Sequence, residues 1–316
     1  MPTITQLEYI VAVDRLRHFG KAAKACHVSQ PSLSMQLHKA EEELGVQIFD
    51  RNKKPILPTD AGKPIIEQAQ QILREHERLL HISRDHTREL SGDFHLGVIP
   101  TLAPYAVPLF IEKFSTAHPA LRLTIDEMKT EDIIAALKSD TLDAGLLATP
   151  LHEKAIDEFP VFYEPFLFYA ATTHPLLEKK FIREGSLEAD DIWLLRDGHC
   201  LRNQVINYCS LQKKKKSVYS NVTFEGGTLE TLRLLIRRNK RGCTLLPQLF
   251  VDGLPPAEIA SSVRPFAAPI PTREVSLVMR RGHWKVAMVH ALADTLKRAL
   301  PKELLEKAEK QVILEI

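Results

Sequence analysis

The 316-residue chain has few cysteines and no stretch that is suited to a membrane. Its first residues lack the charged and apolar regions of a secretory signal, and no window approaches the about 18 apolar residues of a membrane span. We therefore expect a protein of the cytoplasm. Structural disulfides are rare in that reducing compartment, and a disulfide there is more often transient and regulatory.

The sequence also lacks the motifs that hold metals and nucleotides. No two of its four cysteines are separated by two residues, and His199, Cys200 and Cys209 lack the usual spacing of zinc ligands. No G-x-G-x-x-G follows an expected strand, and residues 61–64 share only two letters with a P-loop. We therefore expect neither a metal nor a cofactor. The net charge of +2 is nearly balanced, so a DNA-binding function has to rest on where the basic residues lie.

The first 60 residues have the pattern of a helix-turn-helix. Apolar residues recur at helical spacing in 6–16, and a short alanine-rich helix is expected at 21–26. After a tight turn, Ser29 can cap a further helix that has Pro31 in its first turn and stops at Gly45. Two short helices joined by such a turn form a helix-turn-helix.

The placement of polar and basic residues in this region favours DNA. The N-terminal half of the last helix is polar, and a helix N-terminus favours phosphate. Residues 46–59 are expected to form a two-stranded wing with a basic tip, which is suited to contact with the DNA backbone. A helical hairpin with solvated charges is the alternative. The candidate DNA-binding residues are Ser29, Gln30, Pro31, Ser32, Ser34, Gln36, Arg51 and Lys53.

Residues 60–90 predict a long linker helix with a narrow apolar seam, as in a coiled coil. The simplest use of this helix is dimerisation, which would present two DNA-reading helices to two half-sites. Pro64 is unusual there, because proline beyond the first turn kinks a helix. The seam positions are Ile65, Ala69, Ile72, His76, Leu79 and Ser83.

Beyond a hinge at 89–92, apolar strands alternate with helices. This alternation predicts an α/β domain with a largely parallel sheet, in two lobes with a ligand cleft between them at the strand ends. The expected strands lie near 94–99, 121–125, 144–148, 161–171, 244–246 and 274–279, and the expected helices near 106–117, 130–139, 229–237 and 286–300. The expected domains are a winged helix-turn-helix (1–59), a linker or dimerisation helix (60–90) and a two-lobed α/β regulatory domain (91–316).

Two of the four cysteines lie in the segment 198–209. A neighbouring His, Arg or helix N-terminus lowers the pKa of a thiol from about 8.5, and His199 and Arg202 lie beside Cys200. If 201–209 were helical, nine residues at a rise of about 1.5 Å would set the two Cα atoms about 13 Å apart, whereas a disulfide tolerates at most about 7 Å. Joining Cys200 to Cys209 would require the segment to refold, which makes the pair a candidate switch. The alternative is that both thiols act as small buried apolar groups.

These motifs together resemble a known family. Residues 4–62 contain Phe19-x2-Ala22-Ala23, Val28-Ser29-Gln30-Pro31-Ser32-Leu33-Ser34, Leu44-Gly45, Phe49-x-Arg51 and Thr59-x-Ala61-Gly62. This set is similar to that of the LysR-type transcriptional regulators. Within that family, Asp197-Gly198-His199-Cys200-Leu201-Arg202-x-Gln204 with Cys209 resembles the sensor segment of the peroxide-responsive activators, and the resemblance extends to about residue 300.

The resemblance implies a regulatory domain like a periplasmic binding protein and a mechanism of peroxide sensing. Cys200 would be the peroxidatic thiolate and Cys209 the resolving thiol. The implied partners are promoter DNA of oxidative-stress genes, RNA polymerase, and further copies of the chain in a homodimer or homotetramer. The residues implied to orient hydrogen peroxide and to stabilise the departing hydroxide are Thr101, Thr130, His199 and Arg273.

Two other functions stay open at this point. One is a regulator of the same architecture that binds a small metabolite between its lobes, with the two cysteines as bystanders. The other is a thiol peroxidase, against which the DNA-binding module argues, so we do not expect an enzyme. Two stretches depart from the family pattern, namely Lys213–Lys216, interpreted as a solvated loop, and Arg237–Gly242, which replaces a turn of small residues. Cys26 and Cys243 are interpreted as packing residues.

Overall fold

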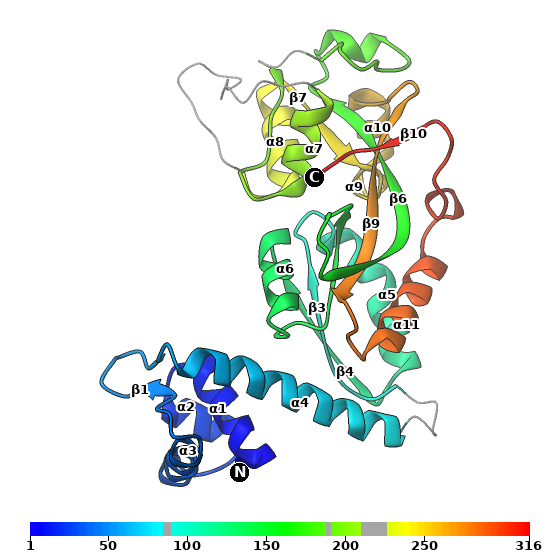
Figure 1. Cartoon of the computed structure of the whole chain (residues 1–316). Helices are drawn as coiled ribbons and strands as arrows, with labels where there is room; N and C mark the ends of the chain where they lie inside the picture. The colour runs from blue at the N-terminus through cyan, green and yellow to red at the C-terminus, as the bar shows by residue number, and fades with distance from the viewer. Residues whose placement is uncertain (85–89, 188–190, 210–225) are drawn as a thin grey trace. The chain divides into compact units, whose positions relative to one another are not determined.

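The computed structural model describes residues 1–84, 90–187, 191–209 and 226–316. The chain divides into two compact units, Met1–Arg88 and Glu89–Ile316 (Figure 1). None of the helices in these described ranges is both long and apolar enough to cross a membrane. The basic run Lys213–Lys216 lies outside the described residues.

The first unit is a bundle of short helices with a small wing, as the sequence predicts. The strands β1 and β2 pair antiparallel, with Phe49 opposite Pro58. Its elements are α1 (Ile4–Leu16), α2 (Phe19–Ala25), α3 (Gln30–Leu44), β1 (Phe49–Asp50), β2 (Leu57–Pro58) and α4 (Gly62–Arg84).

Local capping sets where these helices begin and end. Thr3 and Gln6 form a capping box at the start of α1. The hydroxyl of Ser29 accepts a hydrogen bond from the backbone N–H of Ser32, 3.3 Å away, at the start of α3. Gly45 ends α3 in the left-handed conformation, at φ 66°. The Ser29 cap and the stop at Gly45 confirm the prediction from the sequence, whereas the capping box of α1 was not predicted.

The linker helix α4 begins two residues later than the sequence indicated. Pro64 therefore lies in its first turn, where a missing N–H costs no helical bond, so its presence in this helix is no longer unusual. Ile66 and Ala69 are buried in the core of the first unit. Ile72 and Leu79 are 41% and 65% exposed. The apolar seam thus faces its own unit at one end and solvent further along.

Among the glycines of this unit, Gly62 has the least room for a side chain. A Cβ atom there would lie 2.1 Å from the backbone oxygen of Ile48. We expect Gly62→Ala to lower the free energy of unfolding of the first unit by about 3 kcal/mol, because the backbone cannot move aside cheaply. Far-UV circular dichroism melts and DNA binding test this. Gly253→Ala is the control, since its nearest contact is 3.5 Å away; equal melts for both variants would contradict the prediction.

The second unit alternates strands and helices, as predicted. Its first half contains β3 (Gly92–Val98), α5 (Ala103–Ala117), β4 (Leu121–Glu127), α6 (Thr130–Lys138), β5 (Ala144–Thr149) and β6 (Ile156–Ala170). Its second half contains α7 (Cys200–Tyr208), α8 (Leu229–Asn239), β7 (Cys243–Pro247), α9 (Gln248–Asp252), α10 (Pro256–Ser262), β8 (Val263–Pro265), β9 (Ile270–Arg280), α11 (Val286–Ala299) and β10 (Gln311–Ile313).

The expectation of a largely parallel sheet is wrong. The strand order is β4-β3-β5-β9-β6-β7, and among these neighbours only the β4-β3 and β3-β5 pairs are parallel. The long strands β6 and β9 run antiparallel to each other, and each is antiparallel to its other neighbour in this order. The reason is that β6 carries the chain from one lobe to the other and β9 carries it back.

The two lobes have separate cores, and β6 and β9 pass through both (Figure 1). The first lobe contains β3 to β5 with α5, α6 and α11, and the second contains β7, β8 and α7 to α10. Along β6, Phe162 belongs to the core of the first lobe and Phe166 to that of the second. Glu164 lies between them, opposite Arg273 on β9. This pair marks the point where the chain changes lobes.

The turn after α8 contains its own glycine. Lys240 ends the helix at φ 52°, and Gly242 has φ 86°. A Cβ atom on Gly242 would lie 2.5 Å from Nε1 of Trp193. The stretch Arg237–Gly242 departs from the family pattern but retains a glycine at Gly242. Both the positive φ and the nearby Trp193 indole require a residue without a Cβ atom there.

Candidate functional site

Helix α7 holds the two sensor-segment cysteines at its opposite ends. Cys200 is its first residue and Cys209 is the residue that follows its last. Nine helical steps at about 1.5 Å each separate the two Cα atoms by about 13 Å, well beyond the about 7 Å limit of a disulfide. Both thiols are free. The sequence left open whether this segment is helical. The structure shows that it is, and the helix keeps Cys200 and Cys209 apart.

Side chains of α7 pack into both lobes. Cys200, which is 8% exposed, belongs to the core of the first lobe. Leu201, Val205 and Tyr208 belong to the core of the second lobe, and Cys209 packs against it. A change in the conformation of α7 therefore acts on the packing of both lobes.

The pKa of the Cys200 thiol is raised above its ordinary value of 9.0, which corrects the lowering expected from its neighbours in sequence. Burial is the largest cause. The charge of Arg273, a side-chain hydrogen bond from Thr130 and the backbone N–H groups at the start of α7 act in the opposite direction. Arg202 serves another purpose, because its guanidinium lies 2.7 Å from Asp197 and donates to the carbonyl of Leu195.

Arg273 is a fully buried cation at the junction of the lobes. Its Nε and Nη2 atoms lie 2.8 and 2.7 Å from Oε2 of Glu164, which is itself fully buried. Its Nη1 donates to Oγ1 of Thr101 at 3.2 Å. The other oxygen of Glu164 accepts the backbone N–H of Leu249 at 2.7 Å. The carboxylate both neutralises the guanidinium and fixes its position beside Cys200.

Two buried polar atoms near Cys200 have no nitrogen or oxygen partner within the described part of the chain. They are Nε2 of His199 and Oγ1 of Thr130, the first residue of α6. Burial lowers the pKa of His199, and the nearby charges of Arg196 and Lys129 add to this effect. His199 is therefore neutral at pH 7 and can accept or donate a hydrogen bond. Thr130 has the Cys200 sulfur as a hydrogen-bond partner, whereas Nε2 of His199 has none among the described residues. Buried polar atoms normally find partners, so Nε2 of His199 suits a small polar ligand.

The structure thus brings Thr101, Thr130, His199, Cys200 and Arg273 into one neighbourhood and places Cys209 elsewhere. Burial raises the pKa of Cys209 to about 12, with a further contribution from the Glu184 carboxylate. A thiol with such a pKa is protonated at neutral pH.

The other two cysteines lie outside this neighbourhood. Cys243 is buried in the second-lobe core against which Cys209 packs. Its pKa is raised, first by burial and then by Asp191 and Cys209. Cys26 is partly buried and packs against the core of the first unit. Both have the packing roles that the sequence suggested.

Reasoning from the sequence missed Glu164, and it gave no role to Gln204, which it quoted only as part of the sensor motif. Glu164 is a charged residue within an apolar strand, a signal that could have been used. Gln204 lies on α7, is fully buried, and donates from Nε2 to the carbonyl of Leu314 at 3.1 Å. The backbone N–H of Leu314 in turn donates to Thr272, the neighbour of Arg273. The C-terminal segment is therefore attached both to α7 and to β9.

Some of the candidate DNA-binding residues already have structural partners. Oε1 of Gln36 accepts a hydrogen bond from the buried Gln6 at 3.1 Å, which ties α3 to α1. Nη2 of Arg51 lies 2.7 Å from Glu41, and its guanidinium lies over the ring of Phe19. Glu41 also accepts the backbone N–H of Ile48. Arg51 thereby holds the wing against α3, and its contact with DNA stays a prediction.

The remaining candidates lie at the surface of the first unit. Ser29, Gln30, Pro31 and Lys53 are exposed, while Ser32 and Ser34 are half-buried. Nζ of Lys53 is 4.0 Å from Asp50, a distance that leaves its charge available to phosphate. Their roles in binding DNA are predictions that the fold permits.

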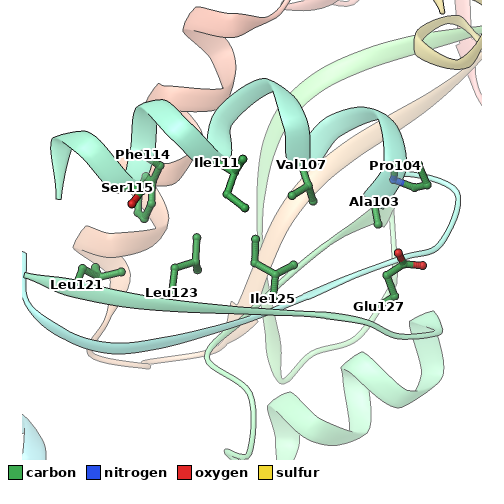
Figure 2. A pocket seen from close by; sticks show the side chains of 10 residues that line it. All are labelled: Ala103, Pro104, Val107, Ile111, Phe114, Ser115, Leu121, Leu123, Ile125 and Glu127. Atoms are coloured by element: carbon green, nitrogen blue, oxygen red, sulfur yellow. The ribbon is translucent and has the colours of Figure 1, made fainter. Parts of the chain in front are cut away.

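A separate apolar groove lies in the first lobe between α5 and β4. Its volume is about 640 Å³, within the size range of ligand pockets. Side chains of the helix and of the strand point toward one another across it (Figure 2). None of the residues that surround Cys200 lines it. The groove therefore belongs to one lobe and is distinct from the thiol site. Its lining residues are Ala103, Pro104, Val107, Ile111, Phe114, Ser115, Leu121, Leu123, Ile125 and Glu127.

Two family models match the chain. Residues 4–63 match the bacterial regulatory helix-turn-helix protein model of the LysR family, and residues 87–301 match the LysR substrate binding domain. The chain is 36% identical over 296 residues to the hydrogen peroxide-inducible genes activator of Dickeya chrysanthemi, covering 93% of this chain and 94% of that protein. It is 34% identical to the DNA-binding transcriptional dual regulator OxyR of Escherichia coli K12, covering 98% and 99%.

A solved structure agrees with these sequence relationships. The full-length structure of an OxyR variant from Pseudomonas aeruginosa superposes with a TM-score of 0.77 at 33% identity, covering 94% of this chain and 98% of that chain. Both units are thus accounted for by proteins that regulate transcription and are not enzymes. The chain belongs to the LysR family of bacterial transcriptional regulators and is an OxyR-like member of it.

Proposed function

We propose that this regulator senses hydrogen peroxide through a reversible disulfide between Cys200 and Cys209 and activates oxidative-stress genes. The observation that carries the proposal is the arrangement around Cys200. A buried thiol at a helix N-terminus lies beside the Arg273 guanidinium and two buried polar atoms that have no nitrogen or oxygen partner among the described residues. This polarity suits a small, uncharged, hydrogen-bonding oxidant.

The chemistry has two steps. The Cys200 thiolate attacks one oxygen of hydrogen peroxide, the O–O bond breaks, and sulfenic acid and hydroxide form. Arg273, Thr101, Thr130 and His199 orient the oxidant and stabilise the departing hydroxide. The Cys209 thiol then gives up its proton as its sulfur attacks the sulfenic sulfur. The S–O bond breaks, the disulfide forms, and the departing hydroxide takes the proton and leaves as water. A thiol reductant reverses the reaction.

The second step requires α7 to unwind, because its helical form keeps the Cα atoms of Cys200 and Cys209 about 13 Å apart, beyond the about 7 Å that a disulfide tolerates. Unwinding withdraws Cys200 from the core of the first lobe and breaks the hydrogen bond between Gln204 and Leu314. Both lobes are then repacked. In a homodimer or homotetramer, such repacking alters how paired DNA-binding units sit on a promoter.

The proposal also covers partners and location. The first unit binds promoter DNA, with the residues of α3 and the wing as contacts, and the linker helix α4 supplies a dimer contact through its exposed Ile72 and Leu79. RNA polymerase is the partner through which a bound activator acts. A protein that binds promoters acts where the chromosome lies, in the cytoplasm.

A mass-mapping experiment tests the sensing mechanism. One equivalent of hydrogen peroxide is expected to link the peptides that contain Cys200 and Cys209, and to shift the footprint of the full-length protein on its promoter. Cys200→Ser is expected to abolish both effects, because the reacting sulfur is missing. Cys243→Ala is the matched control and should keep both.

Other outcomes identify the alternatives. A normal response in Cys200→Ser would sink the proposal and favour a metabolite-binding regulator of the same architecture. A link between Cys209 and Cys243 would show that the resolving step was assigned wrongly. Sustained consumption of peroxide with a reductant would indicate a thiol peroxidase.

A further inference from the structure

The outward face of α3 presents a large apolar side chain. Leu33, Leu37 and Ala40 form its buried face. At 100° per residue, Met35 lies on the opposite side of the helix from these three. It is 63% exposed. In a helix-turn-helix, the side of the second helix that faces away from the bundle enters the major groove.

The charges along α3 restrict where DNA can lie. Glu42 and Glu43 stand exposed near its C-terminal end, and Glu42 pairs with His38 at 3.3 Å. These carboxylates repel phosphate. The N-terminal end has no acidic residue in its first turn and has its capping Ser29. Contact with the groove is therefore confined to the first turns, where Met35 lies.

We propose that Met35 determines sequence specificity by contacting the 5-methyl group of a thymine in each half-site. Thymine is the base that presents a methyl group in the major groove, and apolar side chains recognise it. Within the first two turns of α3, all of whose residues the structure describes, Met35 is the one large apolar side chain that is exposed. Its unbranched, flexible thioether can follow the position of the methyl group. The polar residues around it contact phosphates and other base edges.

The test replaces single thymines by deoxyuridine, which removes the methyl group and leaves base pairing intact. Binding sites are first selected from random duplexes with the full-length, reduced protein. We expect one thymine in each half-site to weaken binding about fourfold when its methyl is removed, the effect of burying one such group. Met35→Ala is expected to bind the thymine and deoxyuridine duplexes equally.

Two controls separate base reading from loss of structure or of charge contacts. Leu44→Ala removes another exposed apolar side chain of α3, 38% exposed at the acidic end, and should keep the full response to deoxyuridine. The slope of the logarithm of affinity against that of salt concentration should be unchanged in Met35→Ala, because no phosphate contact is lost. Equal deoxyuridine sensitivity in the unaltered protein and in Met35→Ala would overturn the proposal. So would sites without a sensitive thymine.

Discussion

Arg273→Met is expected to lower the free energy of unfolding of the second unit by about 3–5 kcal/mol. The substitution leaves Glu164 fully buried without the guanidinium that lies 2.7–2.8 Å from it. A lone buried carboxylate loses its solvation and has no compensating charge. Urea unfolding followed by tryptophan fluorescence measures the change, since both tryptophans, Trp193 and Trp284, lie in the second unit.

A double variant separates the structural role of this ion pair from its proposed chemical role. Arg273→Met with Glu164→Gln removes both charges and keeps an oxygen that can accept the backbone N–H of Leu249. We expect it to recover most of the lost stability, because no uncompensated charge remains. The rate of Cys200 oxidation should stay low in both variants. If the double variant were as unstable as Arg273→Met, the unpaired charge of Glu164 would not be the cause of the instability of the single variant.

The same pair shows where prediction from the sequence stops. Glu164 and Arg273 are 109 residues apart, and their pairing depends on the register of β6 against β9. No local pattern contains that register. For the same reason the neighbouring sequence pointed to Arg202 as the cation beside Cys200. The guanidinium that lowers the pKa of this thiol is that of Arg273 on β9, which was expected only from the family resemblance.

Features set by local interactions were predicted well. The caps of α3 at Ser29 and Gly45, the turn before it and the two-stranded wing all involve residues close in sequence. The sequence considered a helix in this segment only as a condition; the structure supplies the helix α7, and the wide separation of its cysteines follows from it. By contrast, the mixed sheet was missed, since the periodicity of a strand does not reveal the direction of its neighbours.

The position of Cys200 links its chemistry to the conformational change. The thiol is held in the core of the first lobe, while the helix it begins is packed in the second. Oxidation adds a polar oxygen to the sulfur, and a polar group in an apolar core is destabilising unless it is hydrogen-bonded. Oxidation of Cys200 to sulfenic acid therefore already weakens its packing in the core of the first lobe, which holds the start of α7 in place.

Oxidation of Cys200 by peroxide is expected to accelerate about tenfold for each pH unit between about pH 6 and 8. The thiolate is the reactive form, and burial raises the pKa of this thiol above 9.0. Far below the pKa, the thiolate fraction rises tenfold per unit. Quenched-flow mass spectrometry of Cys209→Ser, which stops at the sulfenic acid, measures the rate. A rate that is flat over this range would show that the thiol is already ionised.

The same shift in pKa makes the stability of the reduced protein depend on pH. Below the pKa of the thiol in the unfolded chain, near 9, the folded and unfolded states both keep the proton and stability is unaffected. Above it the unfolded state loses the proton while the folded state holds it, so the unfolded state binds fewer protons and the free energy of unfolding falls as pH rises. Urea unfolding above pH 9 should therefore show a loss that is smaller in Cys200→Ser. An equal loss in both proteins would assign the effect to other groups, such as Cys243.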